Sequence, residues 1–367
     1  MRTLIAGGGT GGHLTPVLAV AQELRRADPD GEVLIVGRRG GVAERLVTSA
    51  GFALETLRVS GLDMRSATSV ARFAAQLPAA IAAAARIIRS FRADVVVGGA
   101  GYVSVPVVLA ARRLRIPVVL LEQNALPGRA TRLLARRSRL VASAFEQTAA
   151  LLPGVRVVHT GNPIRTEVLA VPVRPLDGHC DHVLVMGGSQ GARRINRAVA
   201  GCVRSLLQRY PLLHITHQTG SLDDAEMQTA RAALPDALRA RWRAFPFIDD
   251  VGAAISAADA VLMRAGGSSL AECSAMGRPM ILVPYPHAGD HQRFNARPYA
   301  DAGAARVIPD AECSPQRVAD ELMALIDDPT TWRRMAAASS TLGRRDAAAR
   351  VVDLLGALAG APARIPA

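Results

Sequence analysis

The chain has 367 residues, half of them hydrophobic, and carries a formal net charge of +13. It contains no lysine, so all 44 basic residues are arginines. This excludes a lysine Schiff base and the GxxxxGK[ST] phosphate loop, because both need a lysine amine. A chain of this length is expected to form two domains of roughly 150–200 residues each.

Predicted strands and helices alternate through the first half of the chain, which is typical of a parallel sheet with right-handed crossovers. The predicted strands are residues 3–6, 32–36, 53–59, 94–97, 117–121 and 140–142. The predicted helices are residues 15–27, 42–49, 67–91, 105–114 and 130–135.

Residues 155–178 are rich in proline and irregular in pattern, which predicts a linker. The alternation then restarts. The predicted strands are residues 182–186, 214–218, 242–246, 260–263 and 279–283. The predicted helices are residues 195–209, 225–234, 251–257, a segment ending at 275, the region 315–342 and 347–358, while 284–292 is expected to be a loop.

Two glycine loops follow apolar strands at corresponding places in the two halves: Gly7–His13 and Gly187–Ala192. A loop of this kind presents backbone N–H groups at the positive end of a helix dipole, which suits a phosphate. His13 ends the first loop, where an imidazole with a pKa near 6.5 is suited to remove a proton from a hydroxyl. A capping or core histidine is the alternative for this position.

A dinucleotide-binding fingerprint is the main rival interpretation of the first loop. It requires an acidic residue at the end of the second strand to bind the ribose of NAD. Here that strand is followed by Gly37, Arg38 and Arg39. NAD is therefore disfavoured, whereas the arginines leave a 2′-phosphate and NADP open.

Three loops of the second half are expected at the carboxyl ends of strands, where open α/β sheets bind ligands: 187–192, 266–272 and 287–295. Ser268 and Ser269 add donors to a helix N-terminus in the middle loop. Glu272 is placed to accept from a ribose diol, or else to pair with Ser269 in a capping box. Asp290, His291 and Gln292 form either a binding loop or a solvated one.

Neither the cysteines nor the acidic residues suggest a metal site, and no metal or cofactor is expected. The four cysteines lack CxxC spacing and are expected to be reduced, mostly buried thiols of a cytoplasmic protein. Asp249 and Asp250 are explained by a helix N-cap. No signal peptide is recognised before the first strand and no stretch is long enough to span a bilayer, so a soluble or peripheral protein is expected.

The positive charge is concentrated in the first half: the segment from Arg58 to Glu146 holds fourteen arginines and four acidic residues, a surplus of ten. Nucleic acid is disfavoured as a partner because interleaved aromatic residues are missing. An anionic lipid surface fits better, and an ordinary surface helix is the alternative. The arginines and apolar residues expected to form an interfacial face are Arg65, Arg72, Arg86, Arg89 and Arg92 with Val70, Phe73, Leu77, Ile81, Ile87 and Ile88.

The ordered set of loops resembles glycosyltransferase family 28, whose members in peptidoglycan synthesis convert lipid I to lipid II. The motifs are GGGTGGH (7–13), GAGYVSVP (99–106), EQN (122–124), GNPIR (161–165), GGSQGA (187–192), FID (247–249), AGGSSLAE (265–272) and PYPHAGDHQRFNA (284–296). The resemblance implies a GT-B architecture of two Rossmann-like, doubly wound parallel-sheet domains facing across a cleft. It implies residues 1–163 for the acceptor domain, 164–342 for the UDP-GlcNAc domain, and a final helix, about 343–367, packing back on the first.

The resemblance also implies roles for individual residues. His13 is the implied general base, with Glu122 the weaker candidate. The implied substrate-binding residues are Thr10, Gly11, Gly12, Asn124, Arg165, Ser189, Ile248, Gly267, Ser268, Ser269, Glu272, His291 and Gln292. The chain departs from the family pattern in two places. The pattern has histidine where this chain has Leu121. It also has more glycine in the loop 99–106 than Ala100 and Val105 provide, which affects how closely that loop approaches an acceptor diphosphate.

The implied reaction is inverting transfer of GlcNAc from UDP-GlcNAc to the 4-hydroxyl of the N-acetylmuramoyl unit of lipid I. The implied partners are UDP-GlcNAc, lipid I, an anionic membrane surface and other proteins of cell-wall synthesis, without nucleic acid. The implied location is peripheral, on the cytoplasmic face of the cell membrane. A transferase with another lipid or small-molecule acceptor, a UDP-GlcNAc epimerase and a non-catalytic binding protein are the alternatives.

Overall fold

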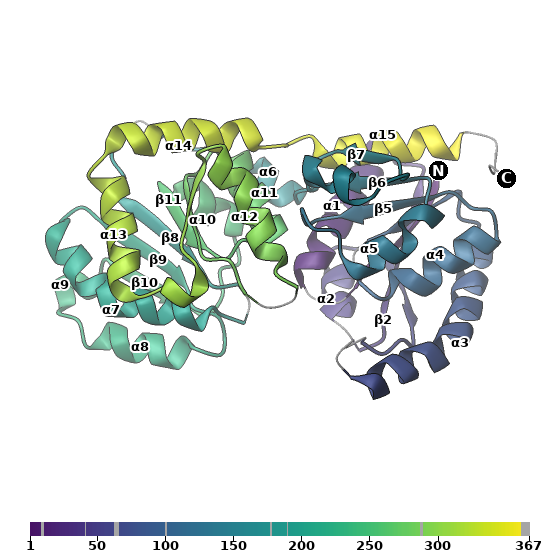
Figure 1. Cartoon of the computed structure of the whole chain (residues 1–367), viewed down its shortest axis with the longest axis horizontal. Coiled ribbons are helices and arrows are strands. Elements are labelled where there is room, and N and C mark those ends of the chain that lie inside the picture. Colours follow the sequence, from purple (N-terminus) through teal and green to yellow (C-terminus); the bar gives the residue numbers. More distant parts are fainter. Residues whose placement is uncertain are drawn as a thin grey trace. The chain divides into compact units, whose positions relative to one another are not determined.

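The computed structural model of the chain describes residues 1–8, 11–40, 42–61, 66–99, 101–176, 178–188, 190–286 and 289–360, and for residues 11–13, 42 and 43 it describes the backbone alone. The chain divides into two compact units, whose elements are labelled in Figure 1. Unit 1 is Met1–Thr166 with Arg345–Ala367, and unit 2 is Glu167–Arg344.

Unit 1 is built on a parallel sheet with the strand order β3-β2-β1-β4-β5-β6-β7. Its strands are β1 (Arg2–Ala6), β2 (Glu32–Arg38), β3 (Ala53–Leu57), β4 (Val95–Gly98), β5 (Val118–Glu122), β6 (Leu140–Ser143) and β7 (Val157–His159). Its α-helices are α1 (Gly11–Ala27), α2 (Val42–Ser49), α3 (Ala67–Phe91), α4 (Ser104–Arg113), α5 (Arg129–Leu134) and α15 (Ala347–Ala359). The short helix α6 (Thr166–Ala170) starts at the last residue of the first segment of unit 1 and otherwise belongs to unit 2.

Alternate strand residues of unit 1 face opposite layers of helices, as the two-residue period of a strand requires. Leu4 and Ala6 pack in one core with residues of α3, α4 and α5. Ile5 packs in the other core with residues of α1 and α15, including Val351. The last helix of the chain therefore completes the core of unit 1.

Unit 2 repeats the topology with the strand order β10-β9-β8-β11-β12-β13, again all parallel. Its strands are β8 (His182–Met186), β9 (His214–Gln218), β10 (Trp242–Phe245), β11 (Ala260–Met263), β12 (Met280–Leu282) and β13 (Ala305–Val307). Its α-helices after α6 are α7 (Arg193–Arg209), α8 (Asp224–Ala232), α9 (Asp236–Arg239), α10 (Val251–Ala257), α11 (Gly267–Ala275), α12 (His291–Asp301), α13 (Pro315–Ile326) and α14 (Pro329–Leu342).

The predicted class, two doubly wound parallel α/β sheets, is confirmed. The prediction of an irregular segment at 155–178 is wrong in part, because β7 pairs with β6 there and α6 follows. The predicted loop 284–292 ends two residues early, since α12 starts at His291, and the strand β13 was not predicted. The four cysteines are free and buried, as expected. Burial raises the pKa of the Cys202 thiol to about 12.

Candidate functional site

The predicted binding residues of unit 2 gather at the carboxyl ends of its strands. β8, β11 and β12 are neighbours in the sheet, so the segments that follow them leave from one edge. Asn295 of α12 is completely buried, and its amide Nδ2 donates to the Ala265 carbonyl at 3.2 Å. This bond ties the segment after β12 to the segment after β11.

α11 begins at this edge. Its N-cap, Gly266, has no side chain to cap the helix, and no atom of the described residues, other than those of the adjoining ones, lies within 4 Å of the place where a Cβ on Gly266 would stand. The first backbone N–H groups of a helix have no carbonyl of that helix to bind, and a helix N-terminus of this kind can bind an anion. The arrangement suits a phosphate group.

The same geometry overturns the capping-box alternative for Glu272. Ser269 is the third residue of α11, not its N-cap, so Ser269 and Glu272 do not occupy the N-cap and N3 positions of a capping box. Glu272 is instead only 5% exposed, one turn below the helix N-terminus. A buried carboxylate in that position fits the predicted role of ribose acceptor.

His291 and Gln292 are the first two residues of α12, and both are half-buried. The Gln292 Oε1 accepts a hydrogen bond from the Tyr285 backbone N–H at 3.0 Å, which leaves its amide NH₂ group as the donor end. Arg264, which follows β11, also contacts the segment after β12. Its guanidinium donates to the Val283 carbonyl at 3.0 Å and lies over the Tyr285 ring. The segments after β11 and β12 are thus fixed to each other from both sides.

The glycine turn after β8 is held against the segment after β9 by backbone contact. A Cβ on Gly191 would lie 2.4 Å from the Thr219 carbonyl oxygen, and one on Gly220 would lie 1.9 Å from the Gly191 nitrogen. Both glycines also have positive φ. No larger residue fits at either position, so glycine is required on both sides of this contact.

Ile248 follows β10, at the far end of the same edge, and is half-buried, whereas its neighbour Phe247 is 57% exposed. The N-cap explanation for the next acidic residues is confirmed at Asp250. Its Oδ1 accepts from the Ala253 backbone N–H at 2.8 Å at the start of α10.

Unit 1 presents a matching edge where β1, β4 and β5 end side by side. Gly99 donates its N–H to the Ala6 carbonyl at 2.7 Å, and a Cβ on Gly101 would lie 2.3 Å from the Gly8 carbonyl oxygen. The segments after β1 and β4 are therefore in backbone contact, as the segments after β8 and β9 are in unit 2.

Glu122, the last residue of β5, lies at this edge and is 3% exposed. One carboxylate oxygen accepts from the Asn124 backbone N–H at 2.9 Å and from its side-chain amide at 3.2 Å. The other oxygen accepts from the Gly128 N–H at 2.9 Å. The carboxylate thus holds the 124–128 loop and orients Asn124.

Several predicted residues lie outside this description. Thr10 and Ser189 are not among the described residues, nor is Ala100, and the side chain of His13 is likewise outside them. The backbone of Gly11, Gly12 and His13 forms the first turn of α1. Arg165 is half-buried and belongs to unit 1, one residue before α6.

The structure describes two of the three positions at which the chain differs from the family pattern, and both lie in a hydrophobic core. Leu121 and Val105 are each 2% exposed and pack in the two cores of unit 1. Neither is therefore available to a ligand.

The interfacial face predicted on residues 65–92 is wrong in its apolar part. Phe73, Ile81 and Ile88 are buried against the sheet, because α3 uses its large apolar side chains to cover the core. The exposed side of α3 consists mainly of alanines with Arg72, Arg86 and Arg89. The prediction that no stretch is long enough to span a bilayer is also wrong by length and composition: among the described residues, α3 is the one helix long and apolar enough to cross a membrane.

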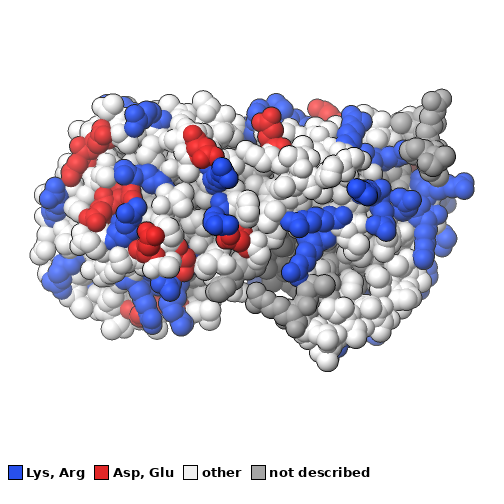
Figure 2. Space-filling model, in the orientation of Figure 1, with Lys and Arg blue, Asp and Glu red and all other residues white. Residues whose placement is uncertain are grey.

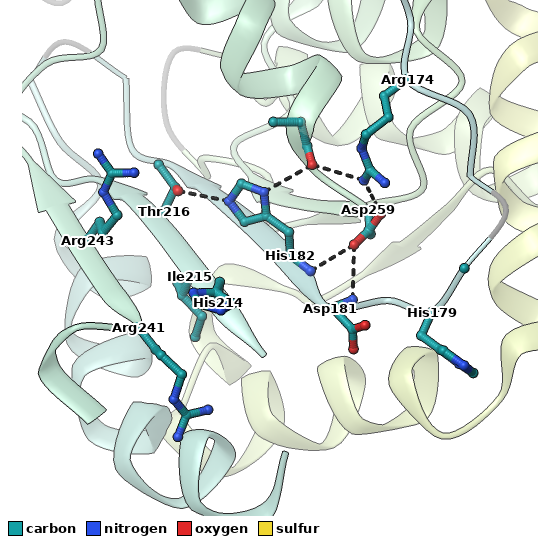
Figure 3. A pocket seen from close by; sticks show the side chains of 12 residues that line it. Arg174, His179, Asp181, His182, His214, Ile215, Thr216, Arg241, Arg243 and Asp259 are labelled. Atoms are coloured by element: carbon teal, nitrogen blue, oxygen red, sulfur yellow. Dashed lines mark hydrogen bonds and ion pairs between the residues drawn. The ribbon is translucent and has the colours of Figure 1, made fainter. Parts of the chain in front are cut away.

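The opposite edge of the unit 2 sheet carries a hollow of about 440 Å³ lined by histidine, arginine and aspartate (Figure 3). Several of its polar groups pair with one another. Asp259 binds the Arg174 guanidinium and accepts from the His182 backbone N–H at 2.8 Å, and the His182 ring is 2.9 Å from the Thr216 hydroxyl. This edge is where the strands begin, away from the glycine turn and α11.

Three buried polar residues behind the glycine turn of unit 2 were missed from the sequence: Asn196, His217 and Asp223. Asn196 donates to the Thr219 carbonyl at 2.7 Å and to Asp223 at 2.9 Å. The available signal was a polar residue at a core position of a predicted helix or strand. Such a residue indicates a buried hydrogen-bond network, but it does not show which segments the network connects.

Comparison with known proteins agrees with this arrangement. Residues 3–143 match the glycosyltransferase family 28 N-terminal domain, and residues 182–351 match the glycosyltransferase family 28 C-terminal domain.

Full-length relatives carry a single name. The chain is 40% identical over 358 residues to the UDP-N-acetylglucosamine--N-acetylmuramyl-(pentapeptide) pyrophosphoryl-undecaprenol N-acetylglucosamine transferase of Geotalea uraniireducens, covering 96% of this chain and 97% of that protein. It is 38% identical over 355 residues to the protein of the same name from Syntrophus aciditrophicus, with the same coverage of both chains.

Among solved structures, Acinetobacter baumannii MurG aligns with a TM-score of 0.76 and 28% identity over 97% of this chain and 99% of that one. A putative UDP-N-acetylglucosamine 2-epimerase of Listeria monocytogenes aligns with a TM-score of 0.72 at 14% identity over 97% and 96%, a likeness of fold alone. The two matched domains, the full-length relatives and the GT-B fold agree: the chain belongs to glycosyltransferase family 28.

Proposed function

We propose that the chain transfers GlcNAc from UDP-GlcNAc, with inversion, to the 4-hydroxyl of the N-acetylmuramoyl unit of lipid I, giving lipid II. Full-length relatives at 38–40% identity carry the name of this activity. The observation that carries the donor half is the N-terminus of α11 with its glycine N-cap at the carboxyl edge of the sheet, and with Glu272 buried one turn below it.

In this proposal the donor binds along the carboxyl edge of unit 2. The N–H groups of Gly267, Ser268 and Ser269 receive the diphosphate, and Glu272 accepts from the ribose hydroxyls. Ile248 presents its backbone to the uracil at the other end of the edge, and Ser189 and Arg165 contact the nucleotide. Gln292 is held by Tyr285 so that its NH₂ group is left to meet the sugar, with His291 beside it.

The chemistry follows from where charge develops. As the glycosidic bond to UDP breaks, the sugar becomes oxocarbenium-like and the leaving diphosphate gains negative charge. Helix N–H groups that are fixed before the reaction stabilise that charge without reorganising. His13 removes the proton of the acceptor hydroxyl as it attacks the anomeric carbon from the opposite face.

Glu122 acts as a positioning residue in this scheme, although it is also the weaker candidate for the base. Both of its carboxylate oxygens accept N–H groups of the 124–128 loop. Its contribution is to aim Asn124 at the sugar, while Thr10, Gly11 and Gly12 complete the acceptor side.

An acceptor carried on undecaprenyl diphosphate requires the enzyme to work at a membrane, and we propose the cytoplasmic face, with the enzyme as a peripheral protein. The basic surface of unit 1 supports this. α4 packs against α3 and α5, and all three helices bear exposed arginines. Figure 2 shows many blue side chains and few red ones on unit 1, while both colours mix on unit 2.

The reaction is tested by incubating the protein with UDP-GlcNAc, with and without a lipid I analogue. UDP release that requires the analogue supports transfer to this acceptor. Sugar isomerisation without any acceptor would identify an epimerase, release with a different lipid would identify another acceptor, and binding without turnover would identify a binding protein. Each of these three outcomes contradicts the proposal.

A further inference from the structure

His217 lies in β9, directly behind the glycine turn of unit 2, and is completely buried. Its ring Nε2 is 3.0 Å from Asn196 Oδ1. Because the Asn196 amide Nδ2 donates to Thr219 and Asp223, its Oδ1 is the acceptor, and His217 Nε2 therefore carries the hydrogen. Burial lowers the pKa of His217 to about 3, so the ring is neutral and this tautomer persists at neutral pH.

This imidazole is poorly explained as a stabilising core residue. Within the described part of the chain its other nitrogen, Nδ1, has no hydrogen-bond partner. Burying a polar atom without a partner costs free energy, and an apolar side chain of similar size would avoid that cost. The ring also stacks on Trp242, with centroids 6.1 Å apart, a contact that an apolar residue would largely keep. What remains specific to histidine is the bond to Asn196.

Asn196 in turn connects the two segments that form the edge. It lies in the first turn of α7, immediately after the glycine turn, and binds the Thr219 carbonyl beyond β9. The Thr219 oxygen is the same atom that a Cβ on Gly191 would meet at 2.4 Å. The asparagine thus fixes the place where the two segments touch, and His217 fixes the rotamer of the asparagine.

The turn that is held in this way contains Gly188, which has positive φ and open space where a Cβ would stand. We propose that His217 is a positioning residue for nucleotide binding, acting through Asn196 to hold the Gly187–Gly188 turn in the conformation that receives the nucleotide. This role rests on the proposed function, since it assigns the turn to UDP.

The test compares H217L, which removes the donor, with H217Q, whose amide NH₂ group reaches about as far as Nε2. Isothermal titration with UDP is expected to show about a tenfold weaker Kd for H217L and a Kd within about threefold of the parent for H217Q. In the transferase assay, the KM for UDP-GlcNAc should rise with H217L while kcat falls less than about threefold, because a lost binding contact affects ground and transition states alike.

His182 supplies the matched control, because it is a half-buried histidine of the neighbouring strand β8 that lies at the opposite edge. Both of its ring nitrogens lie at hydrogen-bond distance from an oxygen, Nδ1 from the Ala257 carbonyl and Nε2 from the Thr216 hydroxyl. H182L should therefore lower Tm while leaving UDP affinity unchanged. A purely structural role for His217 would give the same pattern in H217L and would overturn the proposal.

If H217L does not fold, H217N replaces it, because its shorter amide does not reach Asn196 while the residue stays polar. Equal UDP affinity in H217N, H217Q and the parent would overturn the proposal. A UDP affinity that is kept in H217Q but weakened in H217N supports the proposal, because only the longer amide reaches Asn196. Failure of the parent chain itself to bind UDP would overturn the proposed function and this role together, whereas a UDP affinity in H217L equal to that of the parent overturns this role alone.

Discussion

Glu122, Asn196, His217 and Glu272 are polar side chains that the fold buries almost completely, each at or close to the ligand-facing edge of a sheet. Burying such groups is costly unless they find partners. The partners of Glu122 and Asn196 include backbone groups of the neighbouring loops. These two side chains therefore fix loop shape before any ligand arrives, which is the kind of preorganisation that a binding edge needs.

His217 makes stability depend on pH. Its pKa of about 3 lies below the unfolded value near 6.5, so between these values the unfolded chain binds a proton that the folded chain does not. Stability is then lost as pH falls from 6.5 towards 3, by up to roughly 1.4 kcal/mol per pH unit from this group. Urea unfolding of the parent and H217Q at pH 7.5 and 5.0 measures it: the parent should lose more stability than H217Q over that interval.

The proposed base gives a second prediction at this scale. His13→Ala should lower kcat by about 10²–10⁴, the usual contribution of a general base, while UDP binding is largely kept because the helix end proposed to receive the diphosphate is untouched. The assay is UDP release with a lipid I analogue, and His179→Ala, an exposed histidine of unit 2, is the control. Unchanged turnover in His13→Ala would remove the base assignment.

Between elements, the contacts at the unit 2 edge include a carboxylate that binds two arginines. Asp310, after β13, has one oxygen 2.6 Å from Arg264 and the other 2.9 Å from Arg194. Arg264 begins the segment that leads to α11, and Arg194 lies in the first turn of α7. The bridge therefore connects the start of the helix proposed to hold the phosphates with the helix behind the glycine turn.

Asp310→Asn should raise the KM for UDP-GlcNAc several-fold and destabilise the protein by about 1–3 kcal/mol, the range for a hydrogen bond to a partly buried charged group. Asp327→Asn is the matched control, because its ion pair with Arg209 is well exposed and exposed pairs contribute roughly 0–1 kcal/mol. Denaturant unfolding and steady-state kinetics measure both effects. Equal behaviour of the two variants would mean that the bridge does not shape the edge.

The sequence predicts most elements because apolar runs, glycine loops and helical periods alternate regularly. It misses β7 and β13, which are strands of three residues each, too short for a two-residue period to register. It misses α12 because this helix is polar and contains Pro298. Residues at strand ends are predictable from the alternation alone. The bridge through Asp310 and the network around His217 depend on long-range contacts that no local pattern encodes.

At the scale of the whole chain, the two units share a strand order, to which unit 1 adds β7 at one edge. Each unit also has a glycine turn in backbone contact with the segment after a neighbouring strand. They differ in charge. Ten of the thirteen surplus positive charges lie between Arg58 and Glu146, all within unit 1. A duplicated fold with a one-sided charge suits two different substrates, one of them at an anionic surface.

Vesicles of anionic lipid test that asymmetry. Replacing Arg86, Arg89, Arg112 and Arg113, all exposed on α3 and α4, with glutamine should weaken binding by about 1 kcal/mol per charge at low salt. The effect should shrink as salt rises, since the Debye length falls to about 8 Å at 0.15 M. Co-sedimentation with vesicles across a salt series measures both.

The control replaces Arg243, Arg297, Arg333 and Arg334, which are exposed in unit 2, and so removes the same net charge elsewhere. If net charge alone drives binding, the two fourfold variants lose affinity equally, and the membrane surface is not on α3 and α4. If the surface is there, the unit 2 variant binds like the parent. The large apolar side chains of α3 pack in the core, so electrostatic attraction must supply most of the membrane binding at this surface. Binding that does not depend on salt would contradict this assignment.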